Sequence, residues 1–156
     1  MLDICRNISV ADRKSQAGEF ASIAPAEMTG IELTGKTLGL IGAGNIARIV
    51  GKILVGGFDC NVVAYDPYMP AEAMESFGYK KIETVDDVGK LRAAACDAFV
   101  SEPSTANNTS LYELDNFIGT PHIGAGTEEA LVRMGEESVA NVITVLEGGE
   151  PARRVV

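Results

Sequence analysis

The sequence is short of residues on which several classes of protein depend. It has no tryptophan and one histidine, and its 13 basic residues are outnumbered by 22 acidic ones, which gives a formal net charge of -9. That charge repels the phosphate backbone of nucleic acids and the anionic surface of a membrane, so we expect neither as a partner. No hydrophobic run approaches the length that crosses a bilayer, and no basic segment precedes an apolar run at the start. We therefore expect a soluble, cytoplasmic protein.

Cysteine is also scarce. Cys5, Cys60 and Cys96 are odd in number and far apart, and none stands in a CxxC or Cys/His spacing. This argues against a disulfide framework and against a zinc site, so we expect a reducing compartment and no metal. The chain is nevertheless rich in apolar residues, at 46% of 156, which is enough for one globular domain with a real core.

The apolar residues follow an alternating β and α pattern. Residues 37–41 form a short apolar run that stops at Gly42, after which apolar residues recur at helical spacing until Gly56 and Gly57. Residues 61–65 are a second, β-branched run closed by Asp66 and Pro67. A strand, a helix and a strand within about 30 residues make a βαβ unit, whose strands are parallel.

The remaining elements are less regular. We expect a short helix over 70–77, a weak strand over 80–84, a helical turn over 85–91, and strands over 93–100 and 117–120. A last helix follows Thr127, with a buried stripe of Leu131, Met134, Val142, Val145 and Leu146. Residues 1–35 are expected to be a helix end and a connecting arm, 36–150 the globular domain, and 151–156 a tail.

A nucleotide-binding pattern lies where the first strand meets the first helix. Gly42-Ala43-Gly44-Asn45-Ile46-Ala47 matches G-x-G-x-x-[GA]. Gly42 permits the sharp turn, Gly44 lets the backbone approach a pyrophosphate, and the N–H groups at the helix start can receive its oxygens. Glycine-rich turns are also common in α/β proteins that bind no nucleotide, so this pattern alone leaves both interpretations open.

Asp66 strengthens the nucleotide interpretation. It ends the second strand about twenty residues past the glycines, where a carboxylate can accept hydrogen bonds from ribose hydroxyls. An Asp before Pro is also an ordinary turn former, which is the alternative. No Arg or Lys follows Asp66 before Lys80, so a 2'-phosphate would meet an uncompensated negative charge. The predicted cofactor is NAD, not NADP.

Several segments together resemble one family. Leu33-Thr34-Gly35-Lys36-Thr37-Leu38-Gly39-Leu40-Ile41-Gly42, Ala64-Tyr65-Asp66-Pro67-Tyr68, Ser101-Glu102-Pro103 and Thr120-Pro121-His122-Ile123-Gly124-Ala125 stand in the order found in the D-isomer-specific 2-hydroxyacid dehydrogenases, particularly the phosphoglycerate dehydrogenase-like branch. The resemblance covers nearly the whole chain. It implies the NAD-binding domain of an oxidoreductase that acts on the CH–OH group of small 2-hydroxy acids.

The resemblance also assigns roles to single residues. It implies that Asn45 and Ile46 lie on the pyrophosphate, Asp66 on the adenosine ribose, and Asp97 beside the nicotinamide, with Gly124 in the same cofactor site. His122 would be the general acid/base, and Glu102 would hold and charge-tune its imidazole. A lone histidine is more often structural than catalytic, and that alternative stays beside the catalytic one.

The chain departs from the family in two places. On the order of fifty residues of the doubly wound sheet are missing after Asp66, with the arginine that would clamp the substrate carboxylate. The N-terminal half that supplies the other wall of the substrate cleft is missing as well. We therefore expect a shortened Rossmann-like α/β fold, with a mostly parallel sheet and helices on both faces. Either strand 93–100 pairs beside strand 37–41, or the edge of that strand stays open to aggregation or to a second copy.

Three functions are compatible with these observations. The chain binds NAD without turnover by itself, or it is a dehydrogenase completed by another chain, or it is a dimerisation or scaffold domain or gene remnant that binds no cofactor. We prefer the first. A homodimer is expected through the arm from Ser9 to Gly35 together with the first helix, because that arm resembles the subunit contact of the family.

Overall fold

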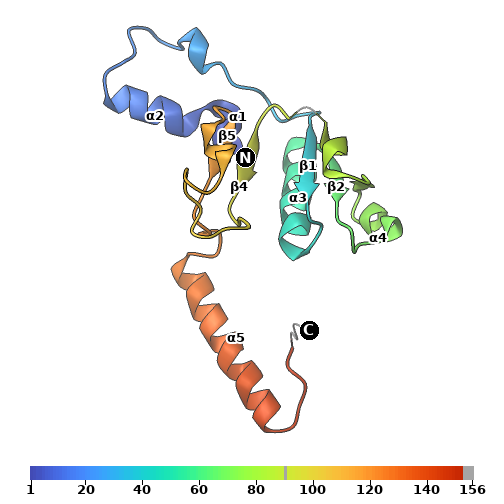
Figure 1. Ribbon diagram of the computed structural model, residues 1–156. Helices are drawn as coiled ribbons and strands as arrows, with labels where there is room; N and C mark the ends of the chain where they lie inside the picture. Colours follow the sequence, from blue (N-terminus) through green and yellow to red (C-terminus); the bar gives the residue numbers. More distant parts are fainter. Residues whose placement is uncertain (90, 153–156) are drawn as a thin grey trace. The chain divides into compact units, whose positions relative to one another are not determined.

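The computed structural model describes residues 1–89 and 91–152. The chain divides into two units, Met1–Ala95 and Cys96–Val156. Figure 1 labels the main helices and strands of both. The predicted boundaries after residues 35 and 150 are a different division, based on chain pattern instead of contacts, and stay a prediction.

A parallel sheet organises the first unit. Its strands β1 (Thr37–Ile41), β2 (Asn61–Tyr65) and β3 (Lys80–Lys81) are hydrogen-bonded in that order, and Thr37 pairs with Asn61 at the start of β1 and β2. Helix α3 (Asn45–Phe58) connects β1 to β2, and α4 (Ala71–Ser76) connects β2 to β3. The predicted βαβ unit and Rossmann-like fold are confirmed.

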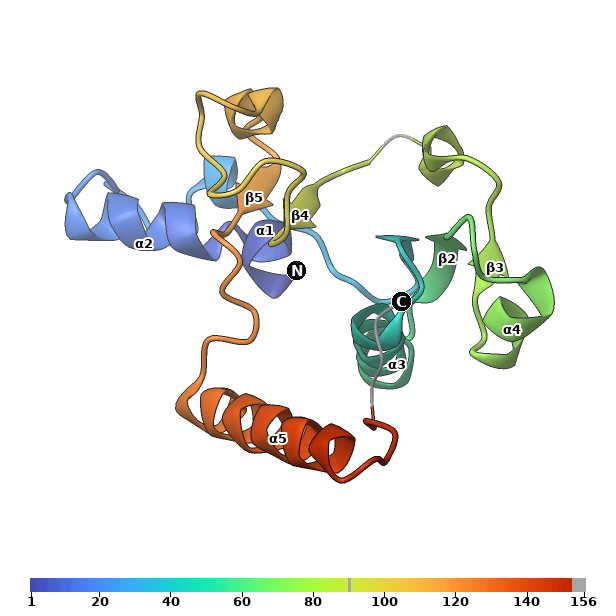
Figure 2. The ribbon, with the colours of Figure 1, turned by 60° about the horizontal axis from the view of Figure 1, so that its bottom comes forward.

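The core of this unit lies between the sheet and its helices. Helix α3 packs against one face of the sheet (Figure 2), so that Leu38 of β1 and Val62 of β2 share a buried cluster with Leu54 of α3. Tyr79 enters the same cluster and donates its hydroxyl to the Arg48 carbonyl at 3.0 Å. A Cβ on Gly51 would lie 2.1 Å from that hydroxyl oxygen, so the close packing of α3 depends on this glycine.

The start of the chain forms two short helices instead of one helix end. Helix α1 (Leu2–Arg6) and α2 (Ile8–Gln16) are separated by Asn7, whose φ of 54° is left-handed and ends the first helix. In residues 17–35 the only helical turn is η1 (Ala26–Met28). After β3, the 3-10 turn η2 (Val85–Val88) is capped reciprocally by Thr84 and Asp87.

A two-stranded sheet lies at the start of the second unit, and its first strand begins at the end of the first unit. Strand β4 (Ala94–Cys96) pairs with β5 (Phe117–Gly119), and η3 (Ser110–Glu113) precedes β5. Three aromatic rings, Phe99, Tyr112 and Phe117, contact one another with centroids 5.7 to 6.2 Å apart. Because β4 pairs with β5, the sheet of the first unit ends at β1 within the described residues.

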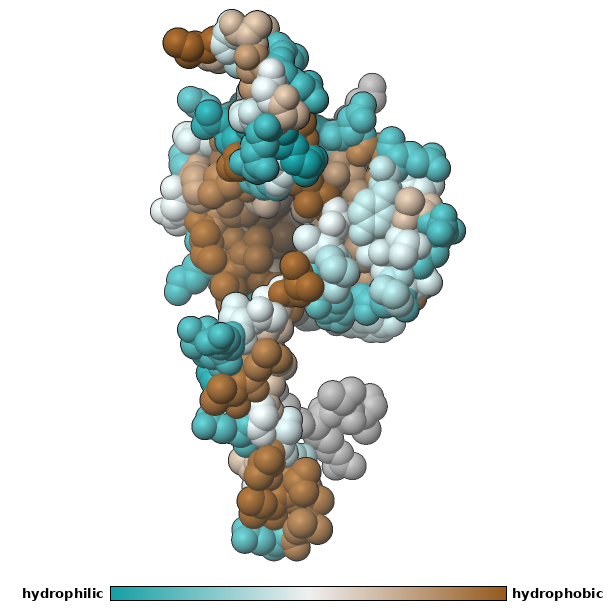
Figure 3. Space-filling model, turned by 90° about the vertical axis from the view of Figure 1, so that its left-hand side faces the viewer, coloured by the Kyte–Doolittle hydropathy of each residue, from teal (hydrophilic) through white to brown (hydrophobic). Residues whose placement is uncertain are grey.

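The last helix, α5 (Glu128–Leu146), is where an expectation fails. Thr127 caps it as predicted, accepting a hydrogen bond from the Ala130 N–H at 3.1 Å. The stripe predicted to be buried is exposed, however, with Leu131 at 59% and Leu146 at 81%, and brown apolar residues lie uncovered along the helix in Figure 3. The aromatic cluster of this unit includes Phe117 of β5 and no residue of α5. Of the helices described, none has the length and apolarity needed to traverse a bilayer.

Candidate functional site

The residues predicted to form the site fall into two groups. Gly42, Gly44, Asn45, Ile46 and Asp66 lie in the first unit, and Asp97, Glu102, His122 and Gly124 in the second. The first group gathers where β1 and β2 end. In doubly wound folds, ligands bind at this edge of a parallel sheet.

The glycine turn has the geometry that a pyrophosphate site requires. Gly42 has a φ of +90°, which favours glycine, and its N–H donates to the Tyr65 carbonyl at 2.7 Å. Gly44 precedes α3, and a Cβ placed on it would meet nothing within 4 Å. No side chain caps this helix, so the first amides of a 14-residue helix are available to an anion.

Asp66 ties the end of β2 to this turn. Its Oδ2 accepts the Ala43 N–H at 3.0 Å, and its Oδ1 accepts the N–H groups of Tyr68 and Met69 at 2.9 and 3.2 Å. These bonds, the Ala43 bond first, lower the pKa of the carboxyl below its ordinary value of 3.8. The carboxylate is therefore ionised at neutral pH and lies beside the glycine turn, as a ribose-binding group must.

Lys81 is a neighbour of Asp66 that the sequence reasoning missed. Its Nζ donates to the Met69 carbonyl at 3.1 Å, and its charge helps to lower the Asp66 pKa. The expectation that no base compensates the carboxylate considered only the residues before Lys80. The parallel pairing of β3 with β2 places Lys81 level with Ala64, two residues before Asp66.

Asn45 and Ile46 begin helix α3. The Ile46 side chain is 80% exposed, so it can contact a bound molecule. The Asn45 amide oxygen accepts a hydrogen bond from the Arg48 guanidinium one turn later. Arg48 also lies over the Phe77 ring at 5.1 Å, which holds a positive charge near the helix start.

In the second group, Asp97 organises the loop after β5. Its Oδ1 accepts the Thr120 hydroxyl at 2.5 Å and the Ile123 N–H at 2.9 Å, and its Oδ2 accepts the Gly124 N–H at 2.8 Å. These bonds, led by Thr120, lower the Asp97 pKa. A Cβ on Gly124 would lie 2.8 Å from Oδ2, so the glycine is needed for this contact. Thr120 belongs to the segment that resembles the family, but the sequence did not predict its hydrogen bond to Asp97.

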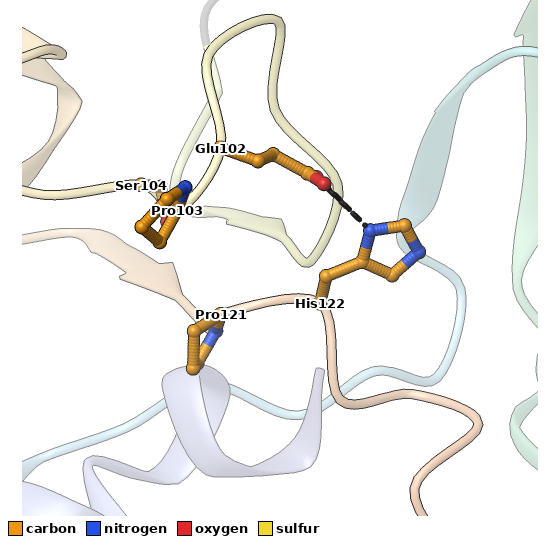
Figure 4. Close-up of a pocket in the computed structure, with 5 residues that line it drawn as sticks. All are labelled: Glu102, Pro103, Ser104, Pro121 and His122. Carbon is orange, nitrogen blue, oxygen red and sulfur yellow. Dashed lines mark hydrogen bonds and ion pairs between the residues drawn. The ribbon is translucent and has the colours of Figure 1, made fainter.

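This loop presents His122 to Glu102. His122 has a φ of 55°, an uncommon conformation for a residue with a side chain, and its Nδ1 lies 2.9 Å from Glu102 Oε2 (Figure 4). The Glu102 hydrogen bond raises the His122 pKa above 6.5, and the imidazole in turn lowers the Glu102 pKa. The Phe99 N–H donates to Glu102 Oε1 at 2.9 Å and helps to fix the carboxylate.

The pair has the arrangement of a general acid/base. Because Glu102 engages Nδ1, the other ring nitrogen, which points away from Glu102 in Figure 4, is left to exchange a proton. The imidazole is 61% exposed and borders an open pocket of about 300 Å³ with Pro103, Ser104 and Pro121. Within residues 1–89 and 91–152, no three His, Cys, Asp or Glu side chains cluster as metal ligands would.

Comparison with known proteins gives one family. The model of the D-isomer specific 2-hydroxyacid dehydrogenase NAD binding domain matches residues 1–89, more than half of the chain. The D-3-phosphoglycerate dehydrogenase of Methanocaldococcus jannaschii is 32% identical over 211 residues, covering 100% of this chain and 39% of that protein. The hydroxypyruvate reductase of Thermotoga maritima is 31% identical over 198 residues, covering 94% of this chain and 63% of that protein.

A solved structure supports the fold independently. The D-mandelate dehydrogenase of Rhodotorula graminis superposes with a TM-score of 0.72 at 16% identity, covering 99% of this chain and 63% of that one. The chain thus spans less than two thirds of each of these proteins. An alignment over 211 residues that contains all 156 residues of this chain includes at least 55 positions that the chain lacks. The internal shortening inferred from the motifs agrees with this difference.

Proposed function

This chain belongs to the D-isomer specific 2-hydroxyacid dehydrogenases, as their NAD-binding domain, and we propose that it holds NAD(H) through the glycine turn and Asp66 without oxidising a 2-hydroxy acid by itself. One observation carries the cofactor half of the proposal. The Asp66 carboxylate binds the Ala43 N–H inside the glycine turn, so an ionised acceptor and the uncapped start of α3 stand side by side. A dinucleotide needs this combination for its ribose and its pyrophosphate.

The nicotinamide end would involve the second group of residues. Asp97 positions the loop that carries His122 and Gly124, and Glu102 keeps the imidazole protonated to a higher pH than usual. When bound, NAD would accept a hydride from a 2-hydroxy acid while the neutral His122 imidazole takes the hydroxyl proton. In the reverse direction the protonated imidazole, which Glu102 favours, would return that proton to the carbonyl oxygen. The proposal assigns no residue to the substrate carboxylate, because nothing in this chain matches the arginine of the family.

A second candidate is a dehydrogenase completed by another chain. The intact hydrogen bond between His122 and Glu102 favours it, since a chain with no catalytic role does not need this pair. A scaffold or remnant that binds no cofactor is the third candidate. The uncapped start of α3 and the ionised Asp66 beside it speak against that one.

The assembly and location are also proposals. A homodimer through the arm from Ser9 to Gly35 is supported by Ile23, which is 99% exposed on that arm. Light scattering of the pure chain at micromolar concentration tests it, and a monomeric mass would contradict it. A cytoplasmic location is supported by Cys5, Cys60 and Cys96, which are all free thiols.

Calorimetric titration of the full chain with NADH and then NADPH tests the cofactor proposal. We expect saturable NADH binding and weaker NADPH binding. Absence of heat with either cofactor would favour the scaffold. Steady NADH production from a 2-hydroxy acid by the pure chain, abolished by His122→Ala, would overturn the statement that this chain does not turn over. Turnover that appears only when a second polypeptide is added would favour the completed enzyme.

A further inference from the structure

Strand β1 has one edge that the structure leaves unpaired. Two bonds fix which way its backbone points: the Asn61 N–H donates to the Lys36 carbonyl at 2.8 Å, and the Gly42 N–H donates to the Tyr65 carbonyl at 2.7 Å. In a parallel ladder, alternate residues face the partner strand. The even-numbered residues 36 to 42 therefore face β2, and Thr37, Gly39 and Ile41 direct their N–H and C=O groups to the opposite edge.

Nothing in the sequence of β1 protects this edge. Proteins usually block an edge strand with a charge, a proline or a bulge. The five residues Thr37–Ile41 contain no charge and no proline, and they pair with β2 in unbroken register. Ile41, which lies on the outward-directed set, is 68% exposed. No strand lies beyond β1 in this sheet among the residues described.

We propose that β1 of one chain pairs antiparallel with β1 of a second copy, about a two-fold axis at Gly39. Gly39 then faces Gly39 of the other copy, and Thr37 faces Ile41 in both directions. All three pairs are of the hydrogen-bonded type, because their members are the outward-directed residues. Each pair exchanges two N–H···O bonds, and the two three-stranded sheets become one continuous sheet.

The side chains are compatible with this pairing. Leu38 and Leu40 lie on the α3 side of the sheet. In the pairing about the two-fold axis, Leu38 of each copy lies opposite Leu40 of the other copy, which makes two apolar pairs. Lys36 comes opposite Gly42, so no two charges of like sign face each other along the ladder. A two-fold interface requires such self-complementarity, and the sequence Thr-Leu-Gly-Leu-Ile meets it about its central glycine.

Amide hydrogen exchange, followed by NMR at low and high protein concentration, tests the proposal residue by residue. We expect the Leu38 and Leu40 amides to be slow at both concentrations, because they bond to β2. The Gly39 and Ile41 amides should be fast when dilute and slower by about tenfold or more once about nine tenths of the chains are paired. If the Gly39 amide is protected equally at both concentrations, a segment of the same chain pairs with this edge and the proposal is wrong. An unprotected Gly39 at both concentrations would overturn it in favour of an open edge.

A pair of variants gives a second test. Thr37→Pro removes an N–H from the free edge and leaves the bonds to β2 in place, whereas Thr37→Ala removes only the side chain. By sedimentation velocity, Thr37→Pro should lose the concentration-dependent dimer and Thr37→Ala should keep it, with slow Leu38 and Leu40 amides showing that both are folded. A dimer formed through the arm instead would raise the mass of both variants and leave Gly39 exchange unchanged, so the two interfaces are distinguished.

Discussion

Replacement of Asp66 tests the cofactor site most directly, since the structure gives this carboxylate two separable roles. In Asp66→Ala, the Ala43 N–H loses its acceptor, and Ala43 is fully buried with 0% exposure. A buried donor left unsatisfied costs about 1–3 kcal/mol. Tyr68 is 94% exposed, so water replaces the bond to its N–H at little cost. We expect the free energy of unfolding to fall by about 1–3 kcal/mol, most of it from Ala43 and a smaller part from the half-buried Met69, whose N–H loses a longer bond of 3.2 Å.

The effect on cofactor binding has a different origin. Loss of a charged hydrogen-bond acceptor for the ribose should weaken NADH binding by about 1.5–3 kcal/mol, or roughly 10- to 150-fold in Kd. NADPH binding should weaken less, because the substitution also removes the negative charge that repels its 2'-phosphate. The difference between the NADH and NADPH affinities should therefore become smaller. Asp66→Asn is the matched control. It keeps an oxygen for the Ala43 N–H and removes the charge, so we expect near-normal stability with weakened NADH binding.

Two assays suffice for these variants. Without tryptophan, urea unfolding is best followed by circular dichroism, and affinities come from calorimetry. Because the Asp66 pKa is lowered on folding, its contribution to stability is complete above the ordinary value of 3.8 and is lost as pH falls through the lower folded value. The difference between the unmutated chain and Asp66→Ala should therefore disappear in acid. An unmutated chain that binds NADH and NADPH equally, or an Asp66→Ala variant with unchanged NADH affinity, would refute the assigned role.

Four further outcomes follow from the same geometry. Lys81→Met should weaken NADPH binding more than NADH binding in calorimetry, because the positive charge of Lys81 lies near Asp66, where the 2'-phosphate of NADPH would bind. Equal weakening of both cofactors would show that Lys81 does not reach the 2'-phosphate. Glu102→Gln should bring the His122 pKa down toward 6.5 in an NMR titration of the lone histidine, and an unmoved pKa would mean that the pair does not form in solution. Since the His122 pKa is raised on folding, the stability it contributes is complete below 6.5 and lost as pH rises through the folded value, a loss that unfolding of Glu102→Gln should not show. Asp97→Ala should speed amide exchange at Ile123 because its acceptor is lost, and unchanged exchange would contradict the positioning role of Asp97.

Features that depend on neighbours along the chain were predictable from the sequence. The turn at Gly42, the strand that ends before Asp66 and the cap at Thr127 each rest on a few consecutive residues with distinctive conformational preferences, and the structure has all three. The candidate residues of the site were found through motifs of this local kind. The alternation of strand and helix then specified the parallel sheet, because a crossover helix requires it.

Features that depend on distant partners were not predictable. The hydrophobic spacing of α5 predicted a buried face, but spacing does not reveal whether a partner surface exists, and Leu146 is 81% exposed. The contact of Gly51 with Tyr79 and the approach of Lys81 to Asp66 join residues that only the folded sheet brings together. The partner of the strand predicted over 93–100 was not predictable for the same reason. In the structure, β4 within that segment pairs with β5.

Whether this chain can be an enzyme alone depends on how much rate its acid/base residues can supply compared with the rate that substrate positioning would supply. His122 and Glu102 are hydrogen-bonded as an acid/base pair would be, and such a pair supplies about 10²- to 10⁴-fold of rate. Holding the substrate carbon against the nicotinamide is worth up to about 7–11 kcal/mol, or roughly 10⁵- to 10⁸-fold. The chain has no match for the carboxylate-binding arginine, and its imidazole is 61% exposed where a closed, dry cleft is required. Positioning outweighs proton transfer by several orders of magnitude, so a hydrogen-bonded His122 and Glu102 without a substrate clamp agree with a domain that binds NAD and does not oxidise a 2-hydroxy acid by itself.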